Sequence, residues 1–283
     1  MKKVLLIFLV LMALLIVFSL IFGLVLQRDI PFTPSKRVAL IRIEGMIMDS
    51  KDTIAEIKEY VKDPNIKAIV LRINSPGGAV APAQEIYKEI KKAVQKKNVV
   101  VSMGSVAASG GYYIASPATR IIANPGTLTG SIGVIMEIPN VEGLLDKLGI
   151  KTEIVKSGKH KDMASIFRGI GKEEKVILQE VLDNVHEQFI QAVVEGRKML
   201  YDDVKTIADG RVFTGEQALK LGLIDELGNL EDALLITAKL SGIDGEPVVV
   251  SKKEQISIMN LLKGPKELIE NIPTVKLKYV FLP

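Results

Sequence analysis

Two glycine-rich turns carry residue types suited to nucleophilic catalysis. They are Asn74-Ser-Pro-Gly-Gly78 and Ala107-Ala-Ser-Gly-Gly-Tyr-Tyr113. A serine between small residues on such a turn exposes its hydroxyl, and glycine lets a substrate approach the backbone N–H groups closely. Either turn alone is also typical of an ordinary strand-to-helix connection. Together they predict a nucleophile, Ser109, that faces backbone donors.

A serine nucleophile needs a base that removes its hydroxyl proton. The chain has two histidines, His160 and His186, so a Ser-His-Asp triad has few ways to form. His186 falls in a predicted helix, at a spacing typical of a surface or packing residue. His160 stands between lysines in the segment 156–163, and a lysine kept neutral by burial in an apolar pocket is the alternative base.

Strands and helices alternate around both turns. β-Branched apolar runs predict strands, and apolar residues at helical spacing predict helices. The predicted strands are 38–43, 66–73, 99–103, 120–123 and 151–155, and the predicted helices are 54–62, 82–97, 172–199, 214–221 and 231–241. This order is typical of parallel α/β units, which bind ligands beyond the carboxyl ends of their strands. Both glycine turns follow such strands.

An apolar run at the start of the chain predicts a transmembrane anchor. Val4 to Leu26 carries no charge, and at about 1.5 Å per residue it would form a helix roughly 35 Å long, enough to cross a bilayer. A cleavable signal peptide is the alternative, but its apolar core is normally shorter, and Gly23 to Gln27 contains no Ala-x-Ala. Basic residues flank the run on both sides, so charge does not decide its orientation.

Composition excludes some classes of function. The net charge of +4 is modest, and the basic residues lack the aromatic interleaving of nucleic-acid-binding proteins, so no nucleic-acid partner is predicted. There are no cysteines and no clustered histidines, so we expect no metal and no organic cofactor.

Several linked motifs resemble the S49 family of serine peptidases, the signal peptide peptidase A family, in its short single-repeat form. The resemblance covers about residues 36–240 and rests on Asn74–Gly78, Ser102–Tyr113, Thr129–Val134, Ser157–Asp162, Gly210–Ala218 and Gly222–Glu226. It implies a Clp-protease/crotonase-like α/β fold on an N-terminal transmembrane helix. It also implies a Ser-Lys dyad that degrades leftover signal peptides and similar apolar peptides.

Carried over position by position, the resemblance gives roles to five residues. Ser109 is the expected nucleophile, Lys161 is the expected general base, and Ser131 is expected to orient the lysine amine. The backbone N–H groups of Gly78 and Gly110 are expected to form the oxyanion hole. Lys161 follows Ser109 by 52 positions, a spacing that agrees with the short members of the family.

The resemblance also implies a location and an assembly. Family members sit in the cytoplasmic membrane as single-pass proteins, with the catalytic domain outside the cytoplasm. In the short members each site is shared between neighbouring subunits, one supplying the serine and another the lysine. We therefore expect a homo-oligomeric ring, and the resemblance suggests eight subunits.

Four parts of the chain are predicted: an anchor at 1–27, a linker at 28–37, the peptidase domain at 38–245 and a C-terminal extension at 246–283. Residues 275–281 show an imperfect alternation of apolar and basic side chains. This pattern predicts an edge strand or a flexible end, or else a tail that lies in the active-site groove as an extended peptide.

Other interpretations stay open on the sequence alone. Lys159 is a weaker candidate base, and Tyr112 and Tyr113 fit either a substrate groove or core packing. A membrane serine peptidase of the stomatin-operon type would use the same dyad on a specific protein partner, and a crotonase-type acyl-CoA enzyme would share the Gly-Gly turns. A non-catalytic scaffold would have no use for an intact Ser109 and Lys161.

Overall fold

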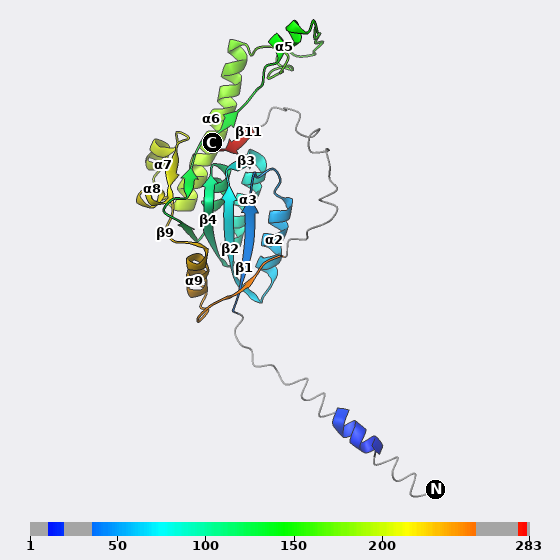
Figure 1. Ribbon diagram of the computed structural model, residues 1–283, viewed down its shortest axis with the longest axis vertical. Helices are drawn as coiled ribbons and strands as arrows, with labels where there is room; N and C mark the ends of the chain where they lie inside the picture. Colours follow the sequence, from blue (N-terminus) through cyan, green and yellow to red (C-terminus); the bar gives the residue numbers. More distant parts are fainter. Residues whose placement is uncertain (1–10, 20–35, 253–276, 282–283) are drawn as a thin grey trace, which may run out of the picture. The chain divides into compact units, whose positions relative to one another are not determined.

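The computed structural model describes residues 11–19, 36–252 and 277–281 (Figure 1). Residues 1–35 and 36–283 are separate compact units. In the first unit, residues 11–19 are helical and exposed. No helix within the described ranges is long and apolar enough to cross a membrane. The predicted anchor and linker, 1–27 and 28–37, lie mostly outside the described residues.

A largely parallel sheet forms the centre of the second unit. Its described strands follow the order β10-β1-β2-β4-β5-β9, and β6 and β8 continue the sheet beside the C-terminal end of β4. The strands are β1 (Arg37–Glu44), β2 (Ile66–Ser75), β4 (Asn98–Ala108), β5 (Arg120–Ala123), β6 (Leu128–Gly130), β8 (Val212–Thr214), β9 (Glu226–Leu227) and β10 (Val248–Val250). Only the β6–β8 pair among them is antiparallel. The predicted parallel α/β class is confirmed.

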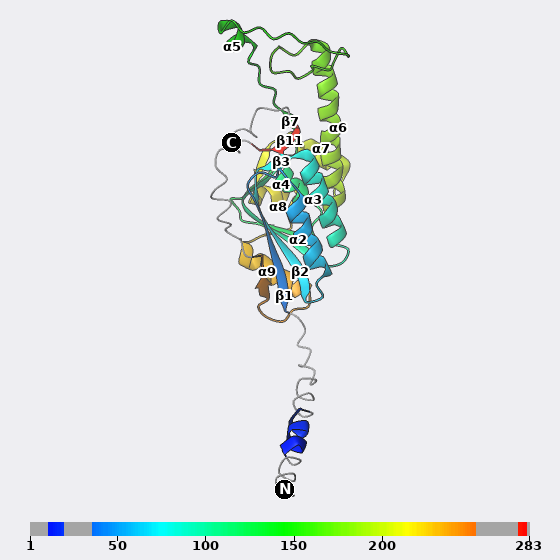
Figure 2. The ribbon, with the colours of Figure 1, turned by 90° about the vertical axis from the view of Figure 1, so that its right-hand side faces the viewer.

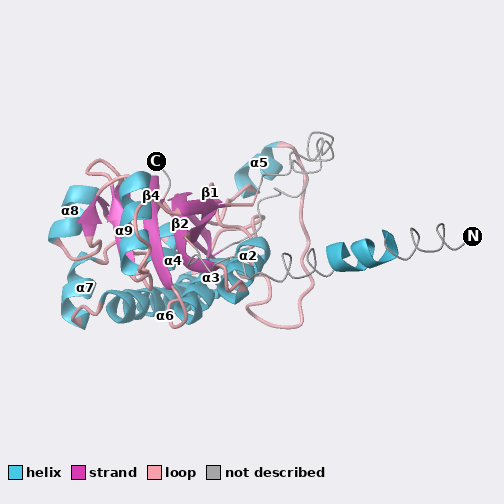
Figure 3. Cartoon of the chain, turned by 90° about the horizontal axis from the view of Figure 1, so that it is seen from below, coloured by secondary structure: helices cyan, strands magenta, loops and turns pink. Residues whose placement is uncertain are grey.

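Helices cover both faces of this sheet (Figure 3). Along β1, Ala39 and Ile41 pack in the larger apolar cluster with helices α2, α3, α4 and α6, whereas Val38 and Leu40 pack against α9. The alternation follows from the strand itself, because successive side chains point to opposite faces. The helices are α2 (Lys51–Lys62), α3 (Val80–Ala93), α4 (Gly110–Ala115), α5 (Glu142–Lys147), α6 (Lys172–Arg197), α7 (Tyr201–Ile207), α8 (Gly215–Lys220) and α9 (Leu230–Leu240).

A second, small sheet forms where the glycine turns lie. It consists of β3 (Gly77–Ala79), β11 (Leu277–Val280) and β7 (Ile135–Met136), with β11 in the middle. The sequence pattern 275–281 therefore does contain a strand. By contrast, the predicted strand 151–155 is wrong: these residues are exposed and have no regular structure. No strand among the described residues pairs with this β-branched run, and a strand requires a partner for its backbone hydrogen bonds.

Residues 137–171, here called the arm, project from the domain. Figures 1 and 2 show α5 and the loops around it at the far end of α6 from the sheet. None of residues 137–173 is buried. Helix α6 meets the core only near its C-terminal end, where Phe189, Ile190 and Val193 are buried.

Candidate active site

Ser109 lies on a sharp turn between β4 and α4. Its backbone has φ 51° and ψ −118°, a conformation that residues other than glycine rarely adopt. The turn is held on both sides: the Ser109 N–H donates to the Gly130 carbonyl at 2.8 Å, and the Ser109 carbonyl accepts from the Tyr113 N–H at 2.8 Å. A strained strand-to-helix turn of this kind presents a serine oxygen at the end of a parallel sheet, as a nucleophile requires.

The two predicted oxyanion-hole residues, Gly78 and Gly110, have adjacent backbones. A Cβ atom on Gly110 would lie 3.2 Å from the Gly78 nitrogen, and one on Gly77 would lie 2.7 Å from the Gly110 nitrogen. Gly77 has φ +103°, which favours glycine. Gly78 also has no room for a side chain, because its Cβ would lie 2.1 Å from the Ile47 carbonyl oxygen. The two glycine turns therefore bring the backbone nitrogens of Gly78 and Gly110 close together, and Gly110 directly follows Ser109.

The C-terminal strand β11 pairs with this turn. It runs antiparallel to β3 with Tyr279 opposite Gly78, and the Phe281 N–H donates to the Pro76 carbonyl at 2.7 Å. Strand β7 pairs with its other edge. The Tyr279 carbonyl oxygen lies 3.1 Å from the position that a Cβ on Gly110 would take. An extended peptide thus places a carbonyl beside both predicted oxyanion-hole residues, as the groove hypothesis for the tail expects.

An aromatic cluster receives the side chain of Tyr279, which is fully buried. Its ring stacks on Tyr113 with centroids 5.1 Å apart and meets Phe189 at 4.8 Å, and its hydroxyl donates to the Val185 carbonyl at 3.1 Å. Burial, reinforced by the charge of Glu195, raises the pKa of Tyr113 to about 12. The sequence allowed Tyr113 to line a substrate groove or to pack in the core. In the structure it does both, because its ring belongs to the core cluster and stacks on Tyr279 of the tail.

Ser131 lies directly after Gly130, the residue that holds the Ser109 turn. Its φ is 50°, its N–H donates to the Arg211 carbonyl at 2.8 Å, and its side chain is almost buried. It lines an open cleft of about 500 Å³ together with His186, whose Nε2 is buried and has no hydrogen-bond partner within the described chain. Ser131 therefore lies next to the residue that holds the Ser109 turn, and the cleft beside it has room for a further side chain.

Lys161 is not part of this cluster. It is exposed and lies on the arm, where its N–H donates to the Gly158 carbonyl at 3.1 Å. The arm is tied to the first turn of α6 by ion pairs with Glu173 and Glu174. From there to Phe189, which packs beside Tyr113, the helix rises roughly 25 Å at 1.5 Å per residue. One chain therefore does not bring its Lys161 to its Ser109.

The other candidate bases also lie on the arm or on α6. Lys159 forms an ion pair with Glu173, and both side chains are exposed, as expected of a solvated surface charge. His160 lies 3.6 Å from the same carboxylate through its Nε2.

The sequence predictions did not include Phe189 or Arg168. Phe189 could have been found as an apolar position of the helix, although nothing local indicates that it meets the tail. Arg168, which binds Asp162 on the arm and Glu174 on α6, belongs to no sequence pattern.

Comparison with known proteins agrees with this geometry. The profile of peptidase family S49 matches residues 91–244, and the profile of Clp protease matches residues 39–126. A protein of Synechocystis sp. named as a protease is 40% identical over 245 residues, which are 86% of this chain and 85% of that protein. A protein of Enterococcus faecium named as a signal peptide peptidase is 33% identical, over 82% of this chain and 72% of its own length.

Protease 4 of Salmonella typhi is 39% identical over 72% of this chain, which corresponds to 34% of that longer protein. The matched profile spans more than half of the sequence and includes the Ser109 turn, Ser131 and Lys161. Profile, relatives and site geometry agree that the chain belongs to peptidase family S49.

Proposed function

We propose that this protein is a membrane-anchored serine endopeptidase that degrades signal-peptide-like apolar peptides with a Ser109–Lys161 dyad. The observation that carries the proposal is the meeting of the two glycine turns. A strained serine, two adjacent glycine nitrogens and the carbonyl of an extended peptide lie together there. These are the parts that acyl transfer from a peptide requires.

The chemistry follows from these positions. The neutral Lys161 amine accepts the Ser109 hydroxyl proton while Oγ attacks the substrate carbonyl carbon. The N–H groups of Gly78 and Gly110 hold the oxyanion of the tetrahedral intermediate. The lysine then donates its proton to the leaving amine, which breaks the peptide bond and leaves an acyl-serine that water hydrolyses. Ser131 holds the amine in place.

We propose further that the lysine comes from a second copy of the chain, in a homo-oligomeric ring. The support is that Lys161 is exposed at the end of the arm, whereas Ser131 borders an open cleft. A lysine base must be kept neutral, and burial against a neighbouring subunit is one way to achieve this. Head-to-tail contacts close into rings when the rotation between subunits closes.

The substrate class rests on the small sheet and on the start of the sequence. The support from the small sheet is that β11 lies extended between β3 and β7 with the Tyr279 ring buried, as a bound peptide strand would lie. The uncharged run Val4–Leu26 is long enough to anchor the enzyme beside membrane-embedded peptides. The proposal places the catalytic domain on the outer side of the cytoplasmic membrane.

Subunit complementation tests the proposal. Ser109→Ala and Lys161→Ala should each abolish cleavage of an apolar signal-peptide substrate in detergent. Co-expressed at equal levels, they should recover about a quarter of wild-type activity, because each shared site draws its two residues from adjacent subunits. The Ser109→Ala, Lys161→Ala double variant co-expressed with Ser109→Ala is the matched control and should stay inactive.

Two results would contradict this assignment. If the two single variants assemble together but recover no activity, each site lies within one chain. If Lys161→Ala keeps most of the activity while His160→Ala loses it, the base is the histidine.

A further inference from the structure

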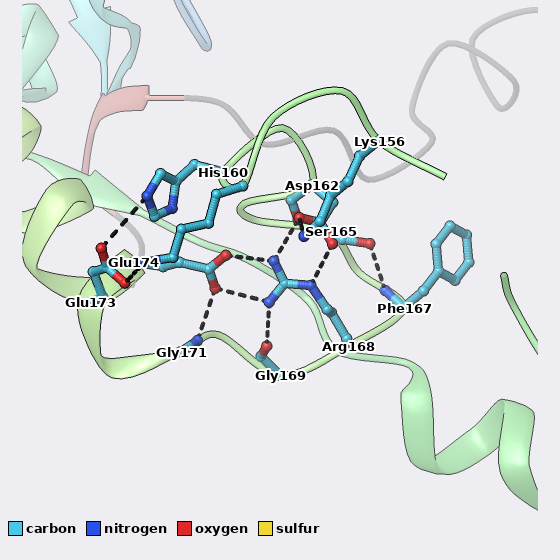
Figure 4. Close-up of polar contacts among 11 residues, drawn as sticks. Lys156, His160, Asp162, Ser165, Phe167, Arg168, Gly169, Gly171, Glu173 and Glu174 are labelled. Atoms are coloured by element: carbon cyan, nitrogen blue, oxygen red, sulfur yellow. Dashed lines mark hydrogen bonds and ion pairs between the residues drawn. The ribbon is translucent and has the colours of Figure 1, made fainter. Parts of the chain in front are cut away.

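The arm carries an ion cluster that includes Asp162, the residue after Lys161 in the sequence (Figure 4). Arg168 is its centre. Its Nε donates to Asp162 at 2.8 Å, and its two terminal nitrogens donate to the two carboxylate oxygens of Glu174 at 2.8 and 2.5 Å. Lys156 binds the other oxygen of Asp162 at 2.5 Å. The guanidinium therefore joins a residue adjacent to Lys161 to the first turn of α6.

The cluster also holds backbone groups of the turn at residues 158–162, here called the lysine turn because it carries Lys161. Arg168 also donates to the main-chain carbonyl of Asp162 at 3.2 Å and to that of Gly169 at 2.9 Å. Within the turn, the Lys161 N–H donates to the Gly158 carbonyl at 3.1 Å. With Asp162 held at both its carboxylate and its carbonyl, the neighbouring peptide unit, which carries Lys161, has little freedom to rotate.

The other end of the cluster is held by the helix. Glu174 accepts from the Gly171 N–H at 2.9 Å and so caps the start of α6, which runs to the core. Its side chain and that of Asp162 are each 10% exposed, although none of the residues 137–173 is buried overall. The arm has no buried apolar residue, and of its ion pairs with α6 this cluster is shielded from solvent, whereas the Lys159–Glu173 pair is exposed.

We propose that Arg168 is a positioning residue for Lys161, acting through Asp162 to deliver the amine to the Ser109 site in one orientation. The proposal rests on the proposed function, in which Lys161 is the base. A forked guanidinium can bind two carboxylates and a carbonyl at once, whereas a lysine ammonium at the same position is a point charge. Within one chain, the small sheet that holds the extended tail consists of β3, β11 and β7 and does not include Arg168.

The test is steady-state kinetics on the full-length oligomer, with Arg168→Met and Arg168→Lys. We expect kcat to fall about 100-fold in Arg168→Met with KM within about threefold, since a displacement of about 1 Å at a reacting group costs that much. Arg168→Lys keeps the positive charge but lacks the forked guanidinium, so it should restore less than a tenth of the lost kcat. Arg120→Gln, which breaks an arginine–carboxylate pair with Asp225 on the core, is the matched control and should leave kcat unchanged.

Hydrogen exchange gives a second readout. In Arg168→Met, amides of residues 158–165 should exchange faster while those of β4 and α4 keep their protection, and the oligomer should keep its size. A kcat within threefold of wild type in Arg168→Met would overturn the proposal, as would a loss of activity that is explained by loss of the oligomer. Failure of the proposed function itself would look different: Lys161→Ala would then stay active.

Discussion

Replacing Tyr279 with alanine should activate the enzyme, if the tail competes with substrate for the groove between β3 and β7. Tyr279 makes two aromatic contacts and one hydrogen bond there. At about 0.5–1.5 kcal/mol for each aromatic pair and about 1 kcal/mol for the hydrogen bond, its removal weakens tail docking by roughly 2–4 kcal/mol. At 1.4 kcal/mol per factor of ten, the open-to-closed ratio rises between about 30-fold and about 700-fold.

The assay is kcat/KM for a fluorogenic apolar peptide, because a substrate that binds only the open groove gains affinity in proportion to the open fraction. The gain in kcat/KM ends once the groove is mostly open. The measured rise is therefore limited either by the calculated factor or by the closed-to-open ratio of the wild-type groove, whichever is smaller. Tyr279→Phe keeps both ring contacts and loses only the bond to Val185, and is the graded control, with a rise of about fivefold. A truncation after Lys276 removes the strand and should match or exceed Tyr279→Ala.

The reasoning is refuted if both Tyr279→Ala and the truncation show wild-type or lower kcat/KM while the oligomer stays intact. Strand β11 would then be a structural part of the groove and not a competitor for it. Loss of oligomers in Tyr279→Ala alone would leave the truncation as the deciding measurement.

Two further predictions concern the turn and the arm. Gly78→Ala should lower kcat/KM at least 100-fold, because its Cβ would lie 2.1 Å from the Ile47 carbonyl oxygen and would displace an oxyanion donor, whereas Gly126→Ala, with open space around it, should be silent in the same assay. The bonds from Arg168, and then from the Gly171 N–H, lower the pKa of Glu174 from 4.5 to about 2. A carboxyl whose pKa is depressed on folding stabilises the arm fully above pH 4.5 and loses this effect as the pH falls toward 2. Amide protection in residues 158–165, corrected for intrinsic exchange, should therefore fall across that window in the wild type but not in Glu174→Gln, and an equal fall in both would contradict the link.

The sequence alone determined the central fold and the glycine-flanked turn on which the proposed nucleophile, Ser109, lies. The strand at 66–73 and the β-branched run before Ser109 carry buried faces that periodicity reveals, and both are present as β2 and β4. The Ser109 turn was predictable because glycines and small residues are needed exactly where the backbone is strained or crowded, as at Gly77 and Gly110. These requirements are local, so the residues around the turn are enough to predict them.

Tertiary structure decided what depends on distant partners. The run 151–155 has the composition of a strand but pairs with no strand in the described part of the chain, whereas Tyr279 pairs with Gly78 across about 200 positions of sequence. The distance between Ser109 and Lys161 likewise follows from the length of α6 beyond its buried end and not from their spacing along the chain. Hydrogen bonds between strands and the reach of a helix are set by packing, so only the folded chain shows that the nucleophile and its predicted base lie apart.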